Sequence, residues 1–220
     1  MRPIVLSASF LLVAQLSLAD CSFETEPSKK RVEPIYDKET GKLQLLEYDS
    51  NGNGQIDTWS YMDGARVVRI EVDTNEDGQV DRWEYYGSAE QLEKIGFSTR
   101  NDGNEDGWLF MGPDGVPTRT ELSTRRDGKV SRVEFYEKNL LARAEEDTDG
   151  DGQMDKWETY DGARLALVAF DTMHRGVPDR RIVYGADATA RVEVDLHGDG
   201  RFVAVGDPTS GSGRSNRGRD

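Results

Sequence analysis

Residues 55–78, QIDTWSYMDGARVVRIEVDTNEDG, contain the pattern from which the fold can be predicted. Aromatic residues alternate with polar ones at Trp59 and Tyr61, and the next polar pair, Asp63-Gly64, is a dipeptide typical of tight hairpin turns. After this turn, apolar residues again occupy every second position up to Val72. A period of two is typical of extended chain, so the stretch predicts a strand, a tight turn, a second strand and a loop.

This unit is repeated along the chain. A six-residue phrase ending in Gly recurs every 24 or 25 residues, and it begins at Asp49, Asp73, Ser98, Ser123, Asp147, Asp171 and Asp195. A fixed period of this size indicates one supersecondary unit copied in tandem, which buries its apolar face only against its neighbours. The sequence therefore predicts an all-β fold: an elongated antiparallel β-meander of tandem hairpins over residues 35–205, with roughly 14 strands.

The composition fits a thin sheet. Hydrophobic residues make up 35% of the chain and charged residues 32%, a poor supply for a thick globular core. Because open sheets rarely exceed about ten strands without coiling or closing, we expect an open superhelical ribbon in preference to a barrel. Four tryptophans that recur at the same place in the repeat are expected to form a ladder on one buried face: Trp59, Trp83, Trp108 and Trp157. The net charge of −14 argues against nucleic acid as a partner.

The amino-terminal residues predict export. A mostly apolar run of 15 residues, Ile4 to Leu18, follows Arg2 and matches the hydrophobic part of a secretory signal peptide, which we place at residues 1–19. Two processing routes stay open. Cleavage after Ala19 would give a mature chain that starts at Asp20, whereas residues 18–21 resemble a bacterial lipoprotein box that would attach lipid to Cys21, although Asp20 departs from that pattern.

The remaining terminal segments are polar. We interpret residues 20–34 as a polar tether and residues 206–220, rich in Gly, Ser and Arg, as a disordered tail. With only one cysteine the chain forms no internal disulfide. The expected locations are the periplasm, the outer membrane through a lipid anchor, or the extracellular space.

Three of the repeated loops carry side-chain oxygens at alternate positions: DSNGNGQID, DTNEDGQVD and DTDGDGQMD. Each loop is named here by its first residue, and its positions are counted from that residue. Oxygens at positions 1, 3, 5 and 9, a carbonyl at position 7, Glu at position 12 and Gly at position 6 are the arrangement of an EF-hand calcium loop. The candidate Ca²⁺ ligands are Asp147, Asp149, Asp151, Gln153, Asp155 and Glu158; Asp73, Asn75, Asp77, Gln79, Asp81 and Glu84; and Asp49, Asn51, Asn53, Gln55 and Asp57.

The loops resemble EF-hand loops in their ligands, and dockerin and thrombospondin type 3 repeats in their tandem use in exported proteins. The resemblance covers about 12 residues at a time. Flanking EF-hand helices are excluded, because 12 residues between loops cannot hold two helices of roughly 11 residues each. If a strand begins at position 9, Asp81 and Glu84 point to opposite faces, and we favour the Asp as ligand.

The loops differ in charge. Ligand charge predicts that calcium affinity falls from the 147 loop to the 73 loop to the 49 loop. Arg100, Arg125 and Arg175 stand at ligand positions in other loops, which we predict to be metal-free, with these arginines pairing to carboxylates such as Asp102 or Asp127. The only histidines, His174 and His197, have no Cys or His partner at ligand spacing, which argues against a zinc site.

The sequence therefore predicts an exported calcium-binding β-repeat protein with a structural or partner-binding role at the cell envelope, where the partner is an envelope protein or a glycan. No nucleophile elbow, phosphate loop or dinucleotide motif is present, so we expect a protein that is not an enzyme; a hydrolase is the remote alternative. The nearer alternative is a carbohydrate-binding module that uses exposed aromatics: Tyr61, Tyr85, Tyr86 and Tyr136.

Overall fold

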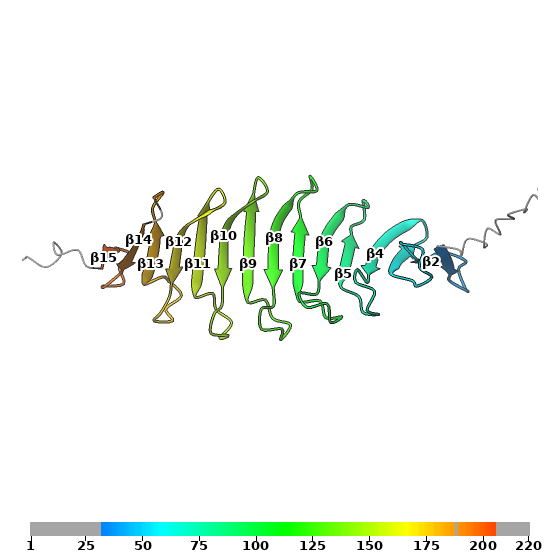
Figure 1. Cartoon of the computed structure of the whole chain (residues 1–220), viewed down its shortest axis with the longest axis horizontal. Helices are drawn as coiled ribbons and strands as arrows, with labels where there is room; N and C mark the ends of the chain where they lie inside the picture. The colour runs from blue at the N-terminus through cyan, green and yellow to red at the C-terminus, as the bar shows by residue number, and fades with distance from the viewer. Residues whose placement is uncertain (1–31, 188, 206–220) are drawn as a thin grey trace, which may run out of the picture.

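The computed structural model describes residues 32–187 and 189–205, and this part of the chain forms one antiparallel sheet whose strands follow one another in chain order (Figure 1). The strands are β1 (Val32–Tyr36), β2 (Leu43–Tyr48), β3 (Thr58–Asp63), β4 (Arg66–Val72), β5 (Arg82–Tyr86), β6 (Leu92–Phe97), β7 (Gly107–Met111), β8 (Pro117–Leu122), β9 (Arg132–Glu137), β10 (Leu140–Glu146), β11 (Lys156–Asp161), β12 (Arg164–Phe170), β13 (Arg180–Tyr184), β14 (Ala190–Val194) and β15 (Val203–Ala204). The predicted all-β meander is confirmed. It is open, with β1 and β15 at its two ends.

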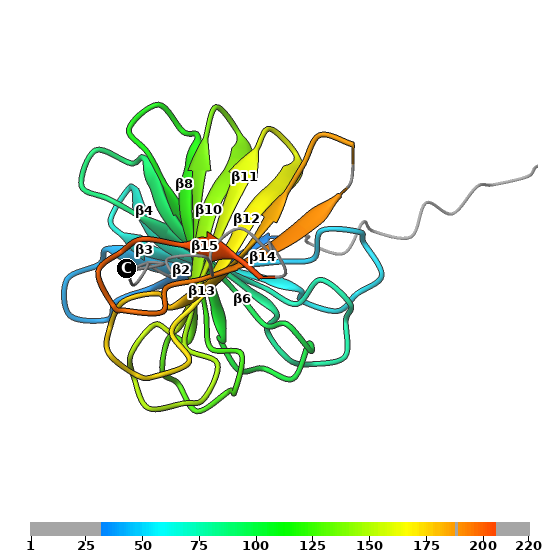
Figure 2. The ribbon, with the colours of Figure 1, turned by 90° about the vertical axis from the view of Figure 1, so that its left-hand side faces the viewer.

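The connections divide between the two edges of the ribbon. Short turns close seven hairpins along one edge, and the repeated loops lie along the other edge (Figure 1). Seven hairpins and the short strand β15 give 15 strands, close to the roughly 14 expected. Viewed along the ribbon, successive strands fan around the long axis, which is the superhelical twist predicted for an open sheet of this length (Figure 2).

A repeated irregularity accompanies this twist. The pairing register shifts within six of the seven hairpins, for example between Tyr61 and Met62 in β3 and between Phe110 and Met111 in β7. An extra residue in one strand of a pair bends that strand and increases its local twist. Because the shift recurs at the turn end of these six hairpins, its contribution to the twist accumulates along the ribbon.

One face of the sheet, named here the Trp face, carries two rows of side chains. The four predicted tryptophans do lie in one row, where Trp59 is opposite Glu71 and Glu71 is opposite Trp83. This Trp–Glu row is not a continuous tryptophan ladder, because other residues separate the tryptophans. Its members in order are Trp59, Glu71, Trp83, Gly96, Trp108, Glu121, Val133, Glu145 and Trp157. Beside it, aromatic rings alternate with cations: Arg69 lies 4.2 Å from the Tyr61 ring centroid, and Arg119, Lys94 and Arg143 stack on Phe110, Tyr85 and Phe135 in the same way.

The apolar core is thin, as the composition predicts. Among the described residues, the buried apolar side chains are Trp83, Ala144, Val168 and Ala169, and the other tryptophans are half-exposed. Most of the buried side chains are instead polar ones at positions 1 and 9 of the loops. Those in this buried row are Asp49, Asp57, Asp73, Asp81, Ser98, Asp106, Ser123, Ser131, Asp147, Asp171, Asp179 and Asp195. The loop edge thus contains a continuous polar row whose hydrogen bonding decides its stability.

The structure begins inside one predicted segment. Strand β1 starts at Val32, three residues before the expected start of the repeat domain, so the end of the predicted tether pairs with β2. The predicted signal peptide, Cys21 and the predicted tail lie outside the described residues. Among the residues that are described, no helix has the length and apolarity needed to cross a membrane.

Candidate metal-binding loops

All seven loops share one backbone conformation. The glycine at position 6 has a positive φ in every loop, a conformation that glycine adopts without steric cost. Position 4 also has a positive φ in every loop, which the sequence did not indicate because only three of its seven residues are glycine. The residues at position 4 are Gly52, Glu76, Asn101, Arg126, Gly150, His174 and Gly198. Two left-handed residues per loop return the chain to the sheet within nine residues.

The carboxylate at position 1 organises the loop from within. In the 147 loop, Asp147 is 3% exposed and accepts hydrogen bonds from the N–H groups of Gly150 at 2.6 Å and Gly152 at 3.0 Å. Burial acts to raise the pKa of Asp147, but these N–H groups and the Arg125 guanidinium outweigh it and lower the pKa below its usual value. Asp73 accepts from Gly78 N–H at 2.8 Å in the same way.

Position 9 closes the base of the loop. The Asp57 carboxylate accepts hydrogen bonds from the N–H of Ser50 at 2.9 Å and from its hydroxyl at 2.7 Å. Six loops form this clamp between a hydroxyl at position 2 and an acceptor at position 9: Ser50–Asp57, Thr74–Asp81, Thr99–Asp106, Thr124–Ser131, Thr148–Asp155 and Thr172–Asp179. In the seventh loop both residues are apolar, Leu196 and Val203. The two positions therefore change together, and the clamp explains why Asp persists at position 9 in loops that lack other predicted ligands.

The carboxylates of the 147 loop converge. Asp147, Asp149 and Asp155 each offer an oxygen within 4.8 Å of the others, so three of the predicted ligands of this loop lie around one point. Asp151 also caps the loop backbone, because its Oδ1 accepts from the N–H of Gln153 at 2.7 Å. Convergent carboxylate oxygens on a rigid loop are the ligand type that hard divalent cations prefer.

The 73 loop brings its ligands together more loosely. Asp77 N–H donates to Asp73 Oδ1 at 3.2 Å, the Asn75 amide donates to Asp77 Oδ2 at 3.1 Å, and Gln79 N–H donates to Asp77 Oδ1 at 2.9 Å. Asp81 Oδ1 is a buried oxygen without a hydrogen-bond partner among the described residues. Such an oxygen is a natural place for water or a cation.

The 49 loop borrows a carboxylate from the next repeat. Its Asn51 and Asn53 amides both donate to the carboxylate of Glu76, which stands at position 4 of the 73 loop. Gln55 N–H donates to Asn53 Oδ1 at 2.8 Å, which is the equivalent of the Gln79 contact. Glu76 is therefore a candidate ligand that sequence spacing could not reveal, because it lies 25 residues from Asn51 in the chain.

The glutamates at position 12 do not join the loops. Glu158 lies in β11 on the face opposite the Trp face, where it accepts from Arg132 at 2.9 Å and Tyr160 at 2.9 Å and pairs with Lys156 at 2.8 Å. Burial acts to raise its pKa, but these partners hold the pKa of Glu158 at about 2. Glu84 is held similarly by Arg82 and Tyr86 in β5. Strand alternation is the reason, because position 12 faces away from Trp83 and Trp157.

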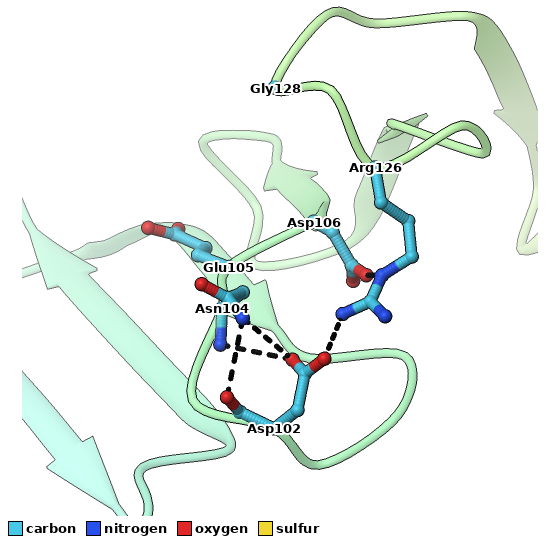
Figure 3. Close-up of a pocket in the computed structure, with 6 residues that line it drawn as sticks. All are labelled: Asp102, Asn104, Glu105, Asp106, Arg126 and Gly128. Carbon is cyan, nitrogen blue, oxygen red and sulfur yellow. Dashed lines mark hydrogen bonds and ion pairs between the residues drawn. The ribbon is translucent and has the colours of Figure 1, made fainter.

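Between the 98 and 123 loops, a guanidinium bridges two carboxylates. Figure 3 shows Arg126 reaching back from position 4 of the 123 loop to Asp102 and Asp106, at one side of a cavity of about 390 Å³. The Arg126 Nε lies 3.0 Å from Asp106 Oδ2, and Arg126 holds the pKa of Asp102 at about 2. A fixed cation in these loops was expected, but it comes from position 4 and crosses to the preceding loop.

Arg125, one of the arginines predicted to pair locally, also crosses to another loop. Its Nη2 lies 2.7 Å from Asp147 Oδ2, and its Nη1 donates to the Asp147 carbonyl at 2.7 Å. The strongest predicted calcium loop therefore carries one positive charge from its neighbour. Contacts between neighbouring loops therefore change the charge around each candidate site. The sequence of one loop alone does not reveal them.

Comparisons with known proteins add little to this geometry. No protein-family model matches the chain, and no curated protein matches it. One solved structure, a crystal structure of accessory secretory protein 1, 2 and 3 in Streptococcus pneumoniae, is similar with 15% identity and a TM-score of 0.26. The match covers 75% of this chain and 23% of the other, and a likeness at that TM-score carries no argument about fold or function.

Proposed function

We propose that this chain is an exported calcium-binding β-repeat protein whose loop edge is stabilised by bound ions. The observation that carries the proposal is the convergence of Asp147, Asp149 and Asp155 within 4.8 Å of one another. Like charges at this distance repel, so an entering divalent cation relieves the repulsion and binding energy is added to folding stability. Calcium is the preferred ion because the converging donors are carboxylate oxygens.

The contacts between loops alter the expected order of affinity. The positive charge of Arg125 offsets the negative charge of one of the four carboxylates in the 147 loop. In the 49 loop, which has two carboxylates of its own, Glu76 adds a third. By ligand charge, the three affinities should then lie closer together than the sequence alone predicts. Weak sites, with Kd of roughly 10⁻⁴ to 10⁻³ M, are useful outside the cell, where calcium is abundant.

The proposed role is structural or partner-binding rather than catalytic. Calcium would make the loop edge rigid, and the sheet would present a long repeated surface to an envelope protein or a glycan, with or without a lipid on Cys21 as anchor. The carbohydrate alternative is weaker because the tyrosine hydroxyls already have carboxylate partners in the chain: Tyr61 donates to Glu71, Tyr85 to Glu105, Tyr86 to Glu84 and Tyr136 to Glu134.

Calcium titration of the untagged chain tests the proposal. At a calcium concentration ten times Kd, each occupied site should add about 1.4 kcal/mol to the free energy of unfolding, which corresponds to a rise in melting temperature of roughly 3–6 °C for a domain of this size. Chelation should reverse the rise. Asp149→Asn and Asp151→Asn together should reduce the stoichiometry measured by isothermal titration calorimetry by one.

Asp127→Asn is the matched control for Asp151→Asn. Asp127 stands at position 5 of the 123 loop and accepts the N–H of Lys129 at 3.0 Å, as Asp151 accepts Gln153, but its loop has Ser at positions 1 and 9. This variant should bind calcium as the unchanged chain does. Identical melting curves with calcium and with chelator, for the unchanged chain, would overturn the proposed function.

A further inference from the structure

Side chains at position 4 reach back over the preceding loop wherever they are long enough. Glu76 contacts Asn51 and Asn53 of the 49 loop, and Arg126 contacts Asp102 of the 98 loop. The third case is His174 of the 171 loop, whose Nδ1 lies 3.2 Å from Asp149 Oδ2 in the 147 loop. The positive φ at position 4 is common to all three, and each of these side chains contacts a residue at position 3 or 5 of the preceding loop.

His174 completes a group of mixed ligand chemistry. Its imidazole nitrogen and one oxygen each from Asp149 and Asp151 all lie within 4.8 Å of one another. The three residues come from two repeats, and His174 is 23 residues from Asp151 in the chain. Ligand spacing within one loop therefore argued against a zinc site, because it could not include a residue contributed across the gap between loops.

We propose that Asp149, Asp151 and His174 bind a divalent transition-metal ion, such as Zn²⁺, across the gap between the 147 and 171 loops. One imidazole nitrogen with two carboxylate oxygens is a ligand set for zinc and its neighbours in the first transition row, with water completing the coordination. Calcium gains little from imidazole, since its ligands are oxygens. The inference rests on the proposed metal-binding function of the 147 loop and deepens it by naming a second metal class and an inter-repeat ligand.

The gap between the 98 and 123 loops already holds a cationic side chain at the equivalent place, which supports a cation between the 147 and 171 loops. There, the Arg126 guanidinium bridges Asp102 and Asp106 of the preceding loop from the same position 4. In the 147 and 171 pair, the residue at position 4 is an imidazole, which can donate an electron pair to a metal where guanidinium cannot. A metal ion held there would join two consecutive loops, as Arg126 joins the two before them.

The test is a Zn²⁺ titration of the untagged full chain and of two variants. His174→Gln removes the imidazole and leaves Asp149 and Asp151 in place, and His197→Gln is the matched control because it removes the only other histidine, in the 195 loop. His174→Gln should weaken Zn²⁺ binding by about tenfold or more, since even loss of an outer-shell partner costs 10–100-fold. His197→Gln should bind Zn²⁺ as the unchanged chain does.

Two further measurements distinguish a failure of the proposed zinc site from a failure of the proposed calcium binding. In ¹H–¹⁵N spectra that report imidazole nitrogens, Zn²⁺ should shift the His174 signals and leave those of His197 in place. Calcium binding should be the same in His174→Gln and in the unchanged chain. Equal Zn²⁺ affinity of all three proteins, or zinc shifts at neither histidine, would overturn the transition-metal site while leaving the calcium proposal intact. Absence of calcium binding with His174-dependent zinc binding would overturn only the calcium proposal.

Discussion

The carboxylate of Glu105 occupies the space above Gly96, where a side chain of that strand residue would lie. A Cβ built on Gly96 would stand 1.9 Å from Glu105 Oε1. In the Trp–Glu row, Gly96 lies between Trp83 and Trp108, at the place that Glu71 holds one repeat earlier. Glu105 therefore supplies from the 98 loop the carboxylate that the strand lacks.

Glu71 and Glu105 make equivalent hydrogen bonds and ion pairs. Tyr61 donates to Glu71 at 2.9 Å, and Tyr85 donates to Glu105 at 2.9 Å. Glu71 pairs with Arg69 at 3.0 Å, and Glu105 lies 3.8 Å from the matching cation, Lys94. The same aromatic, cation and carboxylate group is thus built in successive repeats, although the carboxylate comes from different places in the chain.

Moving the carboxylate from position 105 to position 96 tests whether the two positions are equivalent. Glu105→Ala, which also empties the space above Gly96, should lower the free energy of unfolding by about 1 kcal/mol, and it should lower the pKa of Tyr85, which burial and Glu105 together raise to about 12. Adding Gly96→Glu to that variant should restore stability, whereas Gly96→Glu alone should destabilise by crowding two carboxylates. Urea denaturation and ultraviolet titration of tyrosine measure both effects. If Gly96→Glu has the same effect in both backgrounds, the two positions are not equivalent.

The loop clamp can be tested where no charge is involved. Thr124 and Ser131 share a hydrogen bond of 2.6 Å between their hydroxyls, and Ser131 is fully buried. Thr124→Val and Ser131→Ala should each cost about 1 kcal/mol of stability, because each removes the hydrogen bond between the two hydroxyls. Ser131→Ala also removes the acceptor of the Thr124 N–H. The double variant should cost less than the sum of the two, as the apolar pair Leu196 and Val203 in the last loop indicates. Strict additivity in urea denaturation would show that the clamp is not a coupled unit.

Acid should weaken the ion-pair network on the face opposite the Trp face. Glu158 has a folded-state pKa of about 2, below its ordinary value of 4.5, so its contribution to stability is complete above about pH 4.5 and is lost as the pH falls toward 2. Glu158→Gln should cost about 1–3 kcal/mol at pH 7 and should make the melting temperature less dependent on pH between 4.5 and 2. An unchanged pH dependence in that variant would show that other carboxylates control the acid transition.

Removing the guanidinium between the 98 and 123 loops should destabilise both. Arg126→Gln leaves the buried carboxylate of Asp106 without its charged partner and should cost about 1–3 kcal/mol. The pKa of Asp102 should rise from about 2 toward its ordinary value of 3.8, which carbon-detected nuclear magnetic resonance can follow. Arg100→Gln, an exposed arginine at position 3 of the 98 loop, is the control and should leave both quantities unchanged. Equal effects of the two variants would contradict the role assigned to Arg126.

The fold was predictable because its signals are local. Alternation around Trp59, the turn dipeptide at Asp63-Gly64 and the 24–25-residue step each follow from residues near one another in the chain, and the sheet pairs only such neighbours. The turn between β9 and β10 was the exception. Lys138 and Asn139 both have positive φ there, without glycine, so no turn dipeptide marked it.

The candidate site was predictable only in part, because its contacts cross between loops. Glu76, Arg125 and His174 act on carboxylates or amides 22 to 25 residues away, and no spacing rule for a single loop includes them. The hydroxyl at position 2 was visible as a recurring Ser or Thr, and its covariation with position 9 could have revealed the clamp. The position of Glu158 followed from strand alternation, but its arginine and tyrosine partners depend on the register of the sheet.

In this sheet each strand contacts the strands next to it in the chain, and the apolar core is spread thinly along the whole ribbon. Pulling on its two ends should therefore unzip the molecule one hairpin at a time, with a force that rises and falls once per unit. Deleting a single 24-residue unit would shorten the ribbon and leave its cross-section intact. Length is thus a quantity that evolution can adjust in steps by duplicating or losing copies.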